Sequence, residues 1–177
     1  MYFVIGLGNY GREYENTRHN FAWILFDEHL GKDVWEKDSF LLSFIAEASI
    51  EEENVLFLKP LTYMNLSGKV IPLLKKKYPE QFSPERLIVM HDELDLPFGE
   101  VRAVFNRGDA GHNGVRSITQ HLGTKAFWRI RLGIAQEREG KVIKPNILSP
   151  FHEDELRVIK TEILKKYEKA LKHILVK

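Results

Sequence analysis

The sequence contains no cysteine, which excludes disulfide bonds, thiolate catalysis and cysteine-ligated zinc. It also has no apolar run approaching the ~20 residues that a membrane-spanning helix needs. The net charge is small, because 26 lysines and arginines against 25 aspartates and glutamates leave a formal charge of +1. A polyanion would therefore have to bind through a local patch. The apolar residues 1–5 lack a charged leader region and predict a first strand, not a signal peptide.

Four polar segments are present, each expected at the end of an apolar strand or turn. They are residues 6–20, 59–68, 91–97 and 108–114. Because ligands bind at the strand ends of an open α/β sheet, we expect the four segments to line one crevice. Their histidine, aspartate and asparagine side chains suit proton transfer and the binding of amide and carbonyl groups.

Strand-like and helix-like segments alternate along the chain. Short apolar or alternating runs predict strands at residues 2–7, 40–48, 54–59, 86–91, 101–105 and 128–135, and helical spacing predicts helices at 21–30, 70–77 and 113–122. The tail, with apolar residues every three or four positions, predicts one long amphipathic helix. The sequence therefore predicts an α/β fold: a single three-layer domain over residues 1–177, with a mixed, mostly parallel sheet flanked by helices and a long C-terminal helix.

The first polar segment contains Gly6, Gly8 and Gly11 in the spacing GxGxxG, which is the dinucleotide-binding fingerprint. That fingerprint requires a helix to open at the third glycine, so that its N-terminus meets the pyrophosphate. Residues 12–18 show no apolar periodicity, and the helix is expected to begin only near His19. We therefore interpret the glycines as permitting a tight loop that holds Asn9 and Tyr14 at the crevice.

His19 and Asp92 are the candidates for proton transfer. His19 lies where the first loop meets the first helix, and Asp92 follows the apolar run 87–90, where we expect that strand to end. A carboxylate there can accept from an imidazole Nδ1–H, fix its tautomer and stabilise the imidazolium. Taken singly, each residue also fits a local structural role: a helix-terminus histidine and a turn aspartate.

Two other chemistries fit the sequence poorly. His91, Asp92 and His112 suggest a metal site, but no regularly spaced ligand pair appears, and adjacent strand residues point to opposite faces. A GxSxG serine elbow is absent. Asn65 and Asn113 lie near predicted helix starts, where asparagine caps well, although a neutral amide in the crevice can also donate to a developing oxyanion.

The four segments occur together in the order found in the bacterial peptidyl-tRNA hydrolase family, and the chain closely resembles that family over nearly its whole length. The resemblance rests on Asn9, residues 17–20, 59–68, 91–97 and 111–114, and on residues 146–151 before the last helix. It implies a monomeric, cytoplasmic esterase that needs no metal or other cofactor. The implied substrate is peptidyl-tRNA, whose peptide is released from the 3′-terminal ribose, and no membrane partner is expected.

By motif match, the resemblance implies His19 as general base and Asp92 as its partner. Asn9 would distinguish a blocked peptidyl-tRNA from a plain aminoacyl-tRNA. The other residues implied in substrate and tRNA binding are Tyr14, Tyr63, Met64, Asn65, His112 and Asn113.

The chain departs from the family pattern at two places. Tyr10 stands where many members have proline, so the first loop of this chain lacks the fixed φ that proline would impose. Val104 aligns near a family lysine that grips tRNA phosphate, so Arg102, Arg107 and Arg131 are the candidate substitutes. Two other function classes remain for comparison: a non-catalytic RNA-binding relative of the same fold, and a dinucleotide-dependent oxidoreductase.

Overall fold

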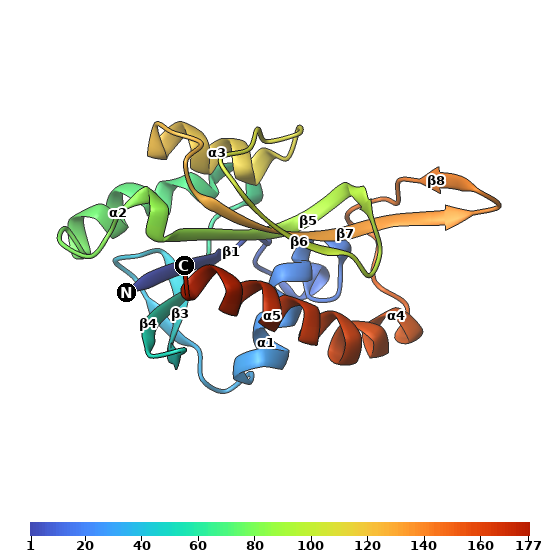
Figure 1. Cartoon of the computed structure of the whole chain (residues 1–177), viewed down its shortest axis with the longest axis horizontal. Coiled ribbons are helices and arrows are strands. Elements are labelled where there is room, and N and C mark those ends of the chain that lie inside the picture. Colours follow the sequence, from blue (N-terminus) through green and yellow to red (C-terminus); the bar gives the residue numbers. More distant parts are fainter.

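One eight-stranded sheet runs through the molecule in the computed structural model, which describes residues 1–177 (Figure 1). The strand order is β2-β3-β4-β1-β5-β7-β6, and β8 pairs with the far end of β7. The strands are β1 (Tyr2–Gly6), β2 (Glu36–Asp38), β3 (Ser43–Ile50), β4 (Glu53–Pro60), β5 (Leu87–Pro97), β6 (Val101–Phe105), β7 (Trp128–Arg138) and β8 (Lys141–Ile143).

The centre of the sheet is parallel and its edges are antiparallel. Strand β1 pairs in parallel with both β4 and β5, and β5 pairs in parallel with β7. The edge pairs β2–β3, β3–β4 and β6–β7 are antiparallel. Because the four central strands run in one direction, the segments that follow β1 and β4 emerge at the same end of the sheet, where these strands finish. The predicted mixed, mostly parallel sheet is confirmed.

Helices cover both faces of the sheet, as the three-layer prediction required (Figure 1). The helices are α1 (Phe21–Leu30), α2 (Val70–Lys77), α3 (Asn113–Leu122), α4 (Glu153–Val158) and α5 (Leu164–Leu175). Helices α1 and α5 pack with Val4, Phe57 and Ile130 in one buried cluster. Helices α2 and α3 pack with Phe3 and Val89 in a second cluster on the opposite face.

Local sequence explains several element boundaries. Helix α3 ends at Gly123, whose left-handed backbone (φ 79°) closes the last turn. The hairpin β3–β4 turns through Glu51 and Glu52, both with positive φ. The predicted strand 40–48 in fact begins at Ser43 and continues to Ile50, and the short edge strands β2 and β8 were not predicted.

Two larger corrections concern β5 and the tail. Strand β5 does not end before Asp92 but continues to Pro97, because its polar half keeps pairing with β7: Asp92 lies opposite Leu132, and Glu93 opposite Gly133. The C-terminal helix is present but is interrupted by a π-helical turn at Ile159–Ile163 between α4 and α5. None of the helices is both long and apolar enough to cross a bilayer.

Candidate active site

His19 and Asp92 meet in the interior although 73 positions separate them. The Nδ1 atom of His19 lies 2.9 Å from both carboxylate oxygens of Asp92. His19 lies in the 3₁₀ turn Arg18–Asn20 that leads into α1, and Asp92 projects from the middle of β5. Both are buried, with 8% and 3% of their surface exposed. The predicted face-to-face arrangement is therefore present in the structure.

His112 is a second imidazole partner of Asp92. Its Nε2 lies 2.9 Å from Asp92 Oδ1, while its Nδ1 accepts from the backbone N–H groups of Gly114 and Val115 at the start of α3. An Nδ1 that accepts carries no proton, so the neutral ring has its hydrogen on Nε2 and donates it to Asp92. The backbone of α3 thus fixes the tautomer of His112.

Asp92 remains ionised in this setting. Burial alone would raise its pKa, but the charge attraction and hydrogen bonds of His112 and His19 outweigh burial and hold the pKa well below the usual range. An ionised carboxylate only accepts, so His19 must donate its Nδ1–H to it. The Nε2 lone pair of His19 is then free to take a proton.

A third histidine lies directly behind this pair. His91 is 1% exposed, its Nδ1 lies 2.8 Å from the carbonyl oxygen of Asp92, and its ring meets His112 edge-on at 4.8 Å. Burial and the neighbouring charge of His112 lower the pKa of His91 well below its ordinary value. Its buried Nε2 has no hydrogen-bond partner, which a neutral ring tolerates better than a charged one.

Asn9 is held rigidly beside His19 by its neighbours on the other segments. Its backbone N–H donates to Asn20 Oδ1 at 2.8 Å, and its carbonyl accepts from Asn20 Nδ2 at 2.9 Å. The backbone N–H of Met64 donates to Asn9 Oδ1 at 3.0 Å, which fixes the orientation of the side-chain amide. The Nδ2 group of Asn9 is then its remaining donor. Asn20 was not predicted as a site residue, although it stood in the motif next to His19.

The other predicted site residues lie on the segments around this pair. Tyr63 is 67% exposed, and Asn65 and Asn113 are also exposed. Tyr14 is half-buried in the first loop, and Met64 is buried. The cap of α3 is the side chain of His112, not that of Asn113. The capping interpretation of Asn113 is thus wrong, and its amide is not needed to close the helix.

Residues 146–155 form a strap over the loop that carries His19. The backbone N–H of His19 donates to the carbonyl of Ile147 at 2.8 Å, and that of Arg18 donates to the carbonyl of Ser149 at 3.0 Å. The buried Arg18 guanidinium makes two 2.8 Å bonds to Glu155 and lies 4.8 Å from the centre of the Phe151 ring. The loop that carries His19 is therefore fixed to the start of α4, which sequence spacing alone did not suggest.

Sequence comparison gives the family. The profile of the peptidyl-tRNA hydrolase family matches residues 3–177. The chain belongs to the peptidyl-tRNA hydrolase family. It is 41% identical to the peptidyl-tRNA hydrolase of Aquifex aeolicus over 170 residues, covering 95% of this chain and 86% of that one. It is 42% identical to the Thermus thermophilus protein of that name over 159 residues, covering 90% and 81%.

Solved structures agree with this family assignment. The crystal structure of peptidyl-tRNA hydrolase from Acinetobacter baumannii superposes with a TM-score of 0.75 at 30% identity, covering 98% of this chain and 94% of that one. The dinucleotide fingerprint requires a helix to open at the third glycine, and the backbone after Gly11 differs from that arrangement. In agreement, residues 12–14 after Gly11 form a short 3₁₀ turn, and α1 begins only at Phe21.

In this peptidyl-tRNA hydrolase fold, the ligand atoms of His19, Asp92 and His112 lie within 4.8 Å of one another, a spacing that also suits a metal. The hydrogen bonds argue against that use. Both ring nitrogens of His112 are occupied, one as acceptor from α3 and the other as donor to Asp92. A cation would have to displace one of these bonds, so the cluster fits proton transfer better than metal binding.

The arginines proposed as phosphate contacts differ in accessibility. Arg131 is 4% exposed and donates to Glu93 at 3.0 Å, so it stabilises the sheet interior. Arg129 is also buried, donates to the carbonyl of Gly108, and has its pKa lowered to about 10 by burial and nearby arginines. Arg102 and Arg107 are exposed, and Arg102 forms an ion pair with Glu100 at 2.6 Å.

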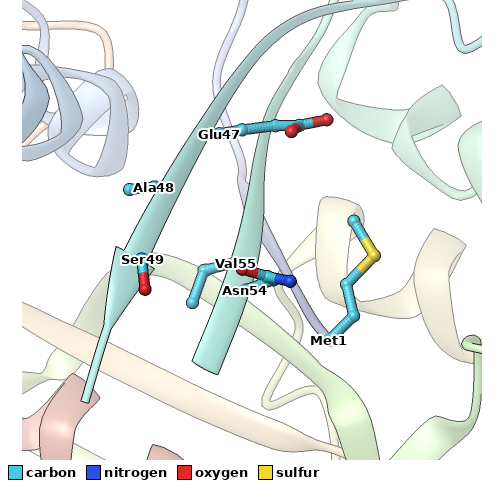
Figure 2. Close-up of a pocket in the computed structure, with 6 residues that line it drawn as sticks. All are labelled: Met1, Glu47, Ala48, Ser49, Asn54 and Val55. Atoms are coloured by element: carbon cyan, nitrogen blue, oxygen red, sulfur yellow. The ribbon is translucent and has the colours of Figure 1, made fainter. Parts of the chain in front are cut away.

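A hollow of about 260 Å³ lies at the opposite end of the strands, and none of the predicted site residues lines it (Figure 2). Figure 2 shows Glu47, Ala48 and Ser49 on β3, Asn54 and Val55 on β4, and Met1 beside them. These residues lie where β1 and β4 begin, whereas the site lies where both strands end. We assign this hollow no role in the chemistry.

Proposed function

We propose that this chain hydrolyses the ester between a peptide and the 3′-terminal ribose of tRNA, releasing free peptide and free tRNA. The observation that carries the proposal is the His19–Asp92 bond inside a peptidyl-tRNA hydrolase fold. The proposed role is rescue of tRNA from abandoned translation in the cytoplasm. All the residues invoked come from one chain, so one copy is enough for the reaction.

In the proposed mechanism, His19 acts as general base through its free Nε2. It takes a proton from a water molecule as that water attacks the ester carbonyl carbon. The imidazolium, stabilised by Asp92, then gives the proton to the ribose oxygen as the carbon–oxygen bond breaks. General-base catalysis of this kind contributes ~10²–10⁴-fold, so no covalent intermediate is needed.

Neutral amides supply the remaining parts of the proposed site. We assign Asn65 and Asn113 to the substrate carbonyl and its developing oxyanion, where one donor is worth ~10²–10³-fold. Tyr14 and Tyr63 are proposed substrate contacts, and Met64 and His112 complete the walls. Arg102 and Arg107 are proposed contacts for tRNA phosphates, and such contacts weaken as salt concentration rises.

Selection against aminoacyl-tRNA is assigned to Asn9. The free Nδ2 of Asn9 can donate to the carbonyl of the amide that blocks the peptidyl end. A plain aminoacyl-tRNA instead carries an α-ammonium, which is costly to desolvate beside a neutral amide site. Since Met64 N–H fixes the Asn9 side chain, the amide cannot turn over to accept from that ammonium.

Release of N-acetyl-aminoacyl groups from tRNA tests the proposal, with unblocked aminoacyl-tRNA as the comparison substrate. We expect the protein to cleave only the blocked ester, and His19→Ala to abolish cleavage with unchanged circular dichroism. His173→Ala, at an exposed histidine of α5, is the matched control and should retain full activity. Retained turnover in His19→Ala would refute the assigned base. tRNA binding without any release by the unaltered protein would instead identify a non-catalytic RNA-binding relative.

A further inference from the structure

A second cavity, of about 640 Å³, lies beside Asn9 and is not part of the His19 site. It is bounded by α1, by the hairpin β3–β4, and by the loop that contains Asn9. His19, Asp92 and His112 do not line it, whereas Asn9 and Asn20 do. The Asn9–Asn20 hydrogen bonds therefore form a wall that the cavity shares with the site. Its volume falls within the ~300–1,000 Å³ typical of pockets that take small organic groups.

Aromatic side chains line this cavity from both sides. The Tyr10 ring, 59% exposed, lies 6.1 Å from that of Phe44 on β3. Trp23 of α1 and Trp35 also line the cavity. The Tyr10 and Phe44 rings contact each other, and their remaining apolar surface faces water, where an apolar group entering the cavity would cover it.

Four of the charged groups that line the cavity form two ion pairs, while Arg12, Glu15 and Lys32 also line it. Lys59 is 6% exposed, forms an ion pair with Asp27, and lies 4.1 Å from the centre of the Trp35 ring. Burial lowers the pKa of Lys59, which the ion pair opposes. At the rim, Lys160 pairs with Glu28 at 3.4 Å. With both pairs satisfied, the cavity offers a ligand aromatic surface more than a buried charge.

The position of Asn9 connects the cavity to the peptide. In the proposed function, the amide next to the esterified residue pairs with Asn9, so the preceding residue of the peptide lies just past Asn9. Asn9 and Asn20 both line the cavity, so it opens directly beside that position. We propose that it receives the side chain of the residue preceding the esterified one, with preference for large apolar and aromatic side chains. This inference rests on the proposed function and adds a peptide specificity to it.

The assignment can be tested with three tRNA substrates that differ only in their peptide. They are the N-acetyl-Ala, N-acetyl-Gly-Ala and N-acetyl-Phe-Ala esters. We expect kcat/KM for the Phe-Ala ester to exceed that for the Gly-Ala ester about 10-fold, since even one methylene in an apolar pocket is worth ~10–200-fold. Phe44→Ala should bring this ratio close to one. The N-acetyl-Ala ester has no side chain to place in the cavity, so its hydrolysis should not change.

Two further variants keep the test decisive. Phe44 is half-buried and outside both buried clusters, and Tyr10→Ala removes the ring that contacts Phe44 at a mostly exposed residue, so neither change opens the core. Phe105→Ala removes a comparably exposed ring on β6, outside the cavity, and should leave the ratio unchanged.

The possible failures are distinguishable. Equal kcat/KM for Gly-Ala and Phe-Ala esters, or an equal loss on all three substrates in Phe44→Ala and Tyr10→Ala, would overturn the cavity assignment alone. If the unaltered protein cleaved none of the three, the proposed function would fail, and the assignment with it.

Discussion

Replacing Asp92 by asparagine should reverse the tautomer of His19 while leaving the shape of the site intact. In the structure, α3 forces His112 to carry its proton on Nε2 and to donate it to residue 92. An asparagine there can accept that bond only through its oxygen. Its NH₂ group then takes the place of the other carboxylate oxygen, 2.9 Å from His19 Nδ1, where it repels an Nδ1–H and donates to an unprotonated Nδ1. The amide oxygen, also 2.9 Å from Nδ1, competes with it as an acceptor. We expect the NH₂ group to prevail, which places the His19 proton on Nε2. The proposed base would have no lone pair toward the substrate.

The size of the effect follows from this geometry. A wrong-tautomer substitution of this kind lowers turnover by ~10⁴-fold in the aspartate-to-asparagine precedent for serine proteases. We expect a loss of about 10³–10⁴-fold in kcat here, or about 4–5.5 kcal/mol of transition-state stabilisation at ~1.36 kcal/mol per tenfold. KM should change little, because residue 92 is buried and is not proposed to touch the substrate.

A double variant tests whether His112 sets the amide orientation. His112→Asn retains a side chain that can cap α3 but cannot reach residue 92 as the imidazole does. In the background of Asp92→Asn it should raise kcat, because the amide is then free to turn its oxygen toward His19. In the background of the natural Asp92 it should lower kcat or leave it unchanged. Single-turnover hydrolysis of N-acetyl-aminoacyl-tRNA measures all four proteins. A further loss in the double variant would refute the tautomer argument.

Two other changes probe the framework of the site. Burial keeps His91 neutral in the folded protein, whereas the same histidine in the unfolded chain is protonated below its ordinary pKa of ~6.5. The free energy of unfolding is therefore highest above pH ~6.5, and it falls by about 1.4 kcal/mol per pH unit below that pH. In urea titrations from pH 7.5 to 5, His91→Asn should flatten this decline, and an unaltered slope would contradict it. Gly68→Ala should lower stability by ~1–3 kcal/mol, because a Cβ there would lie 2.1 Å from the Ser117 carbonyl oxygen. Gly108→Ala, which meets nothing within 4 Å, is its control, and equal unfolding midpoints for the two would contradict the packing argument.

Local signals predicted the helices well. The predicted bounds of α1, α2 and α3 match the structure, because apolar spacing and a following glycine or Tyr-Pro pair define them within a few residues. The same signals failed for β5. Its second half contains Asp92 and Glu93, which are typical of a loop when read locally, yet Arg131 and the two histidines compensate their charges inside the sheet. That compensation depends on residues 20 to 73 positions away.

The site could be predicted only in part, because its contacts also join segments that are far apart in the sequence. The rule that strand ends share one crevice placed the segments of His19 and Asp92 together, and the family resemblance paired the two residues. Spacing alone could not, since nothing local joins the first loop to β5. The use of His112 as a helix cap depends on where α3 begins relative to β5. Sequence reasoning considered capping for Asn65 and Asn113, beside a role in substrate binding, and not for His112. The Arg18–Glu155 pair spans 137 positions, so no pattern within a window would have revealed it.

The strap over the His19 loop makes the geometry of the site depend on a segment far away in the chain. Residues 147–155 hold the backbone of His19 and the side chain of Arg18. Proteins open locally as well as globally, so a local opening of this segment would release the loop while the central strands stay paired. We expect mild denaturant to abolish ester cleavage before the sheet unfolds.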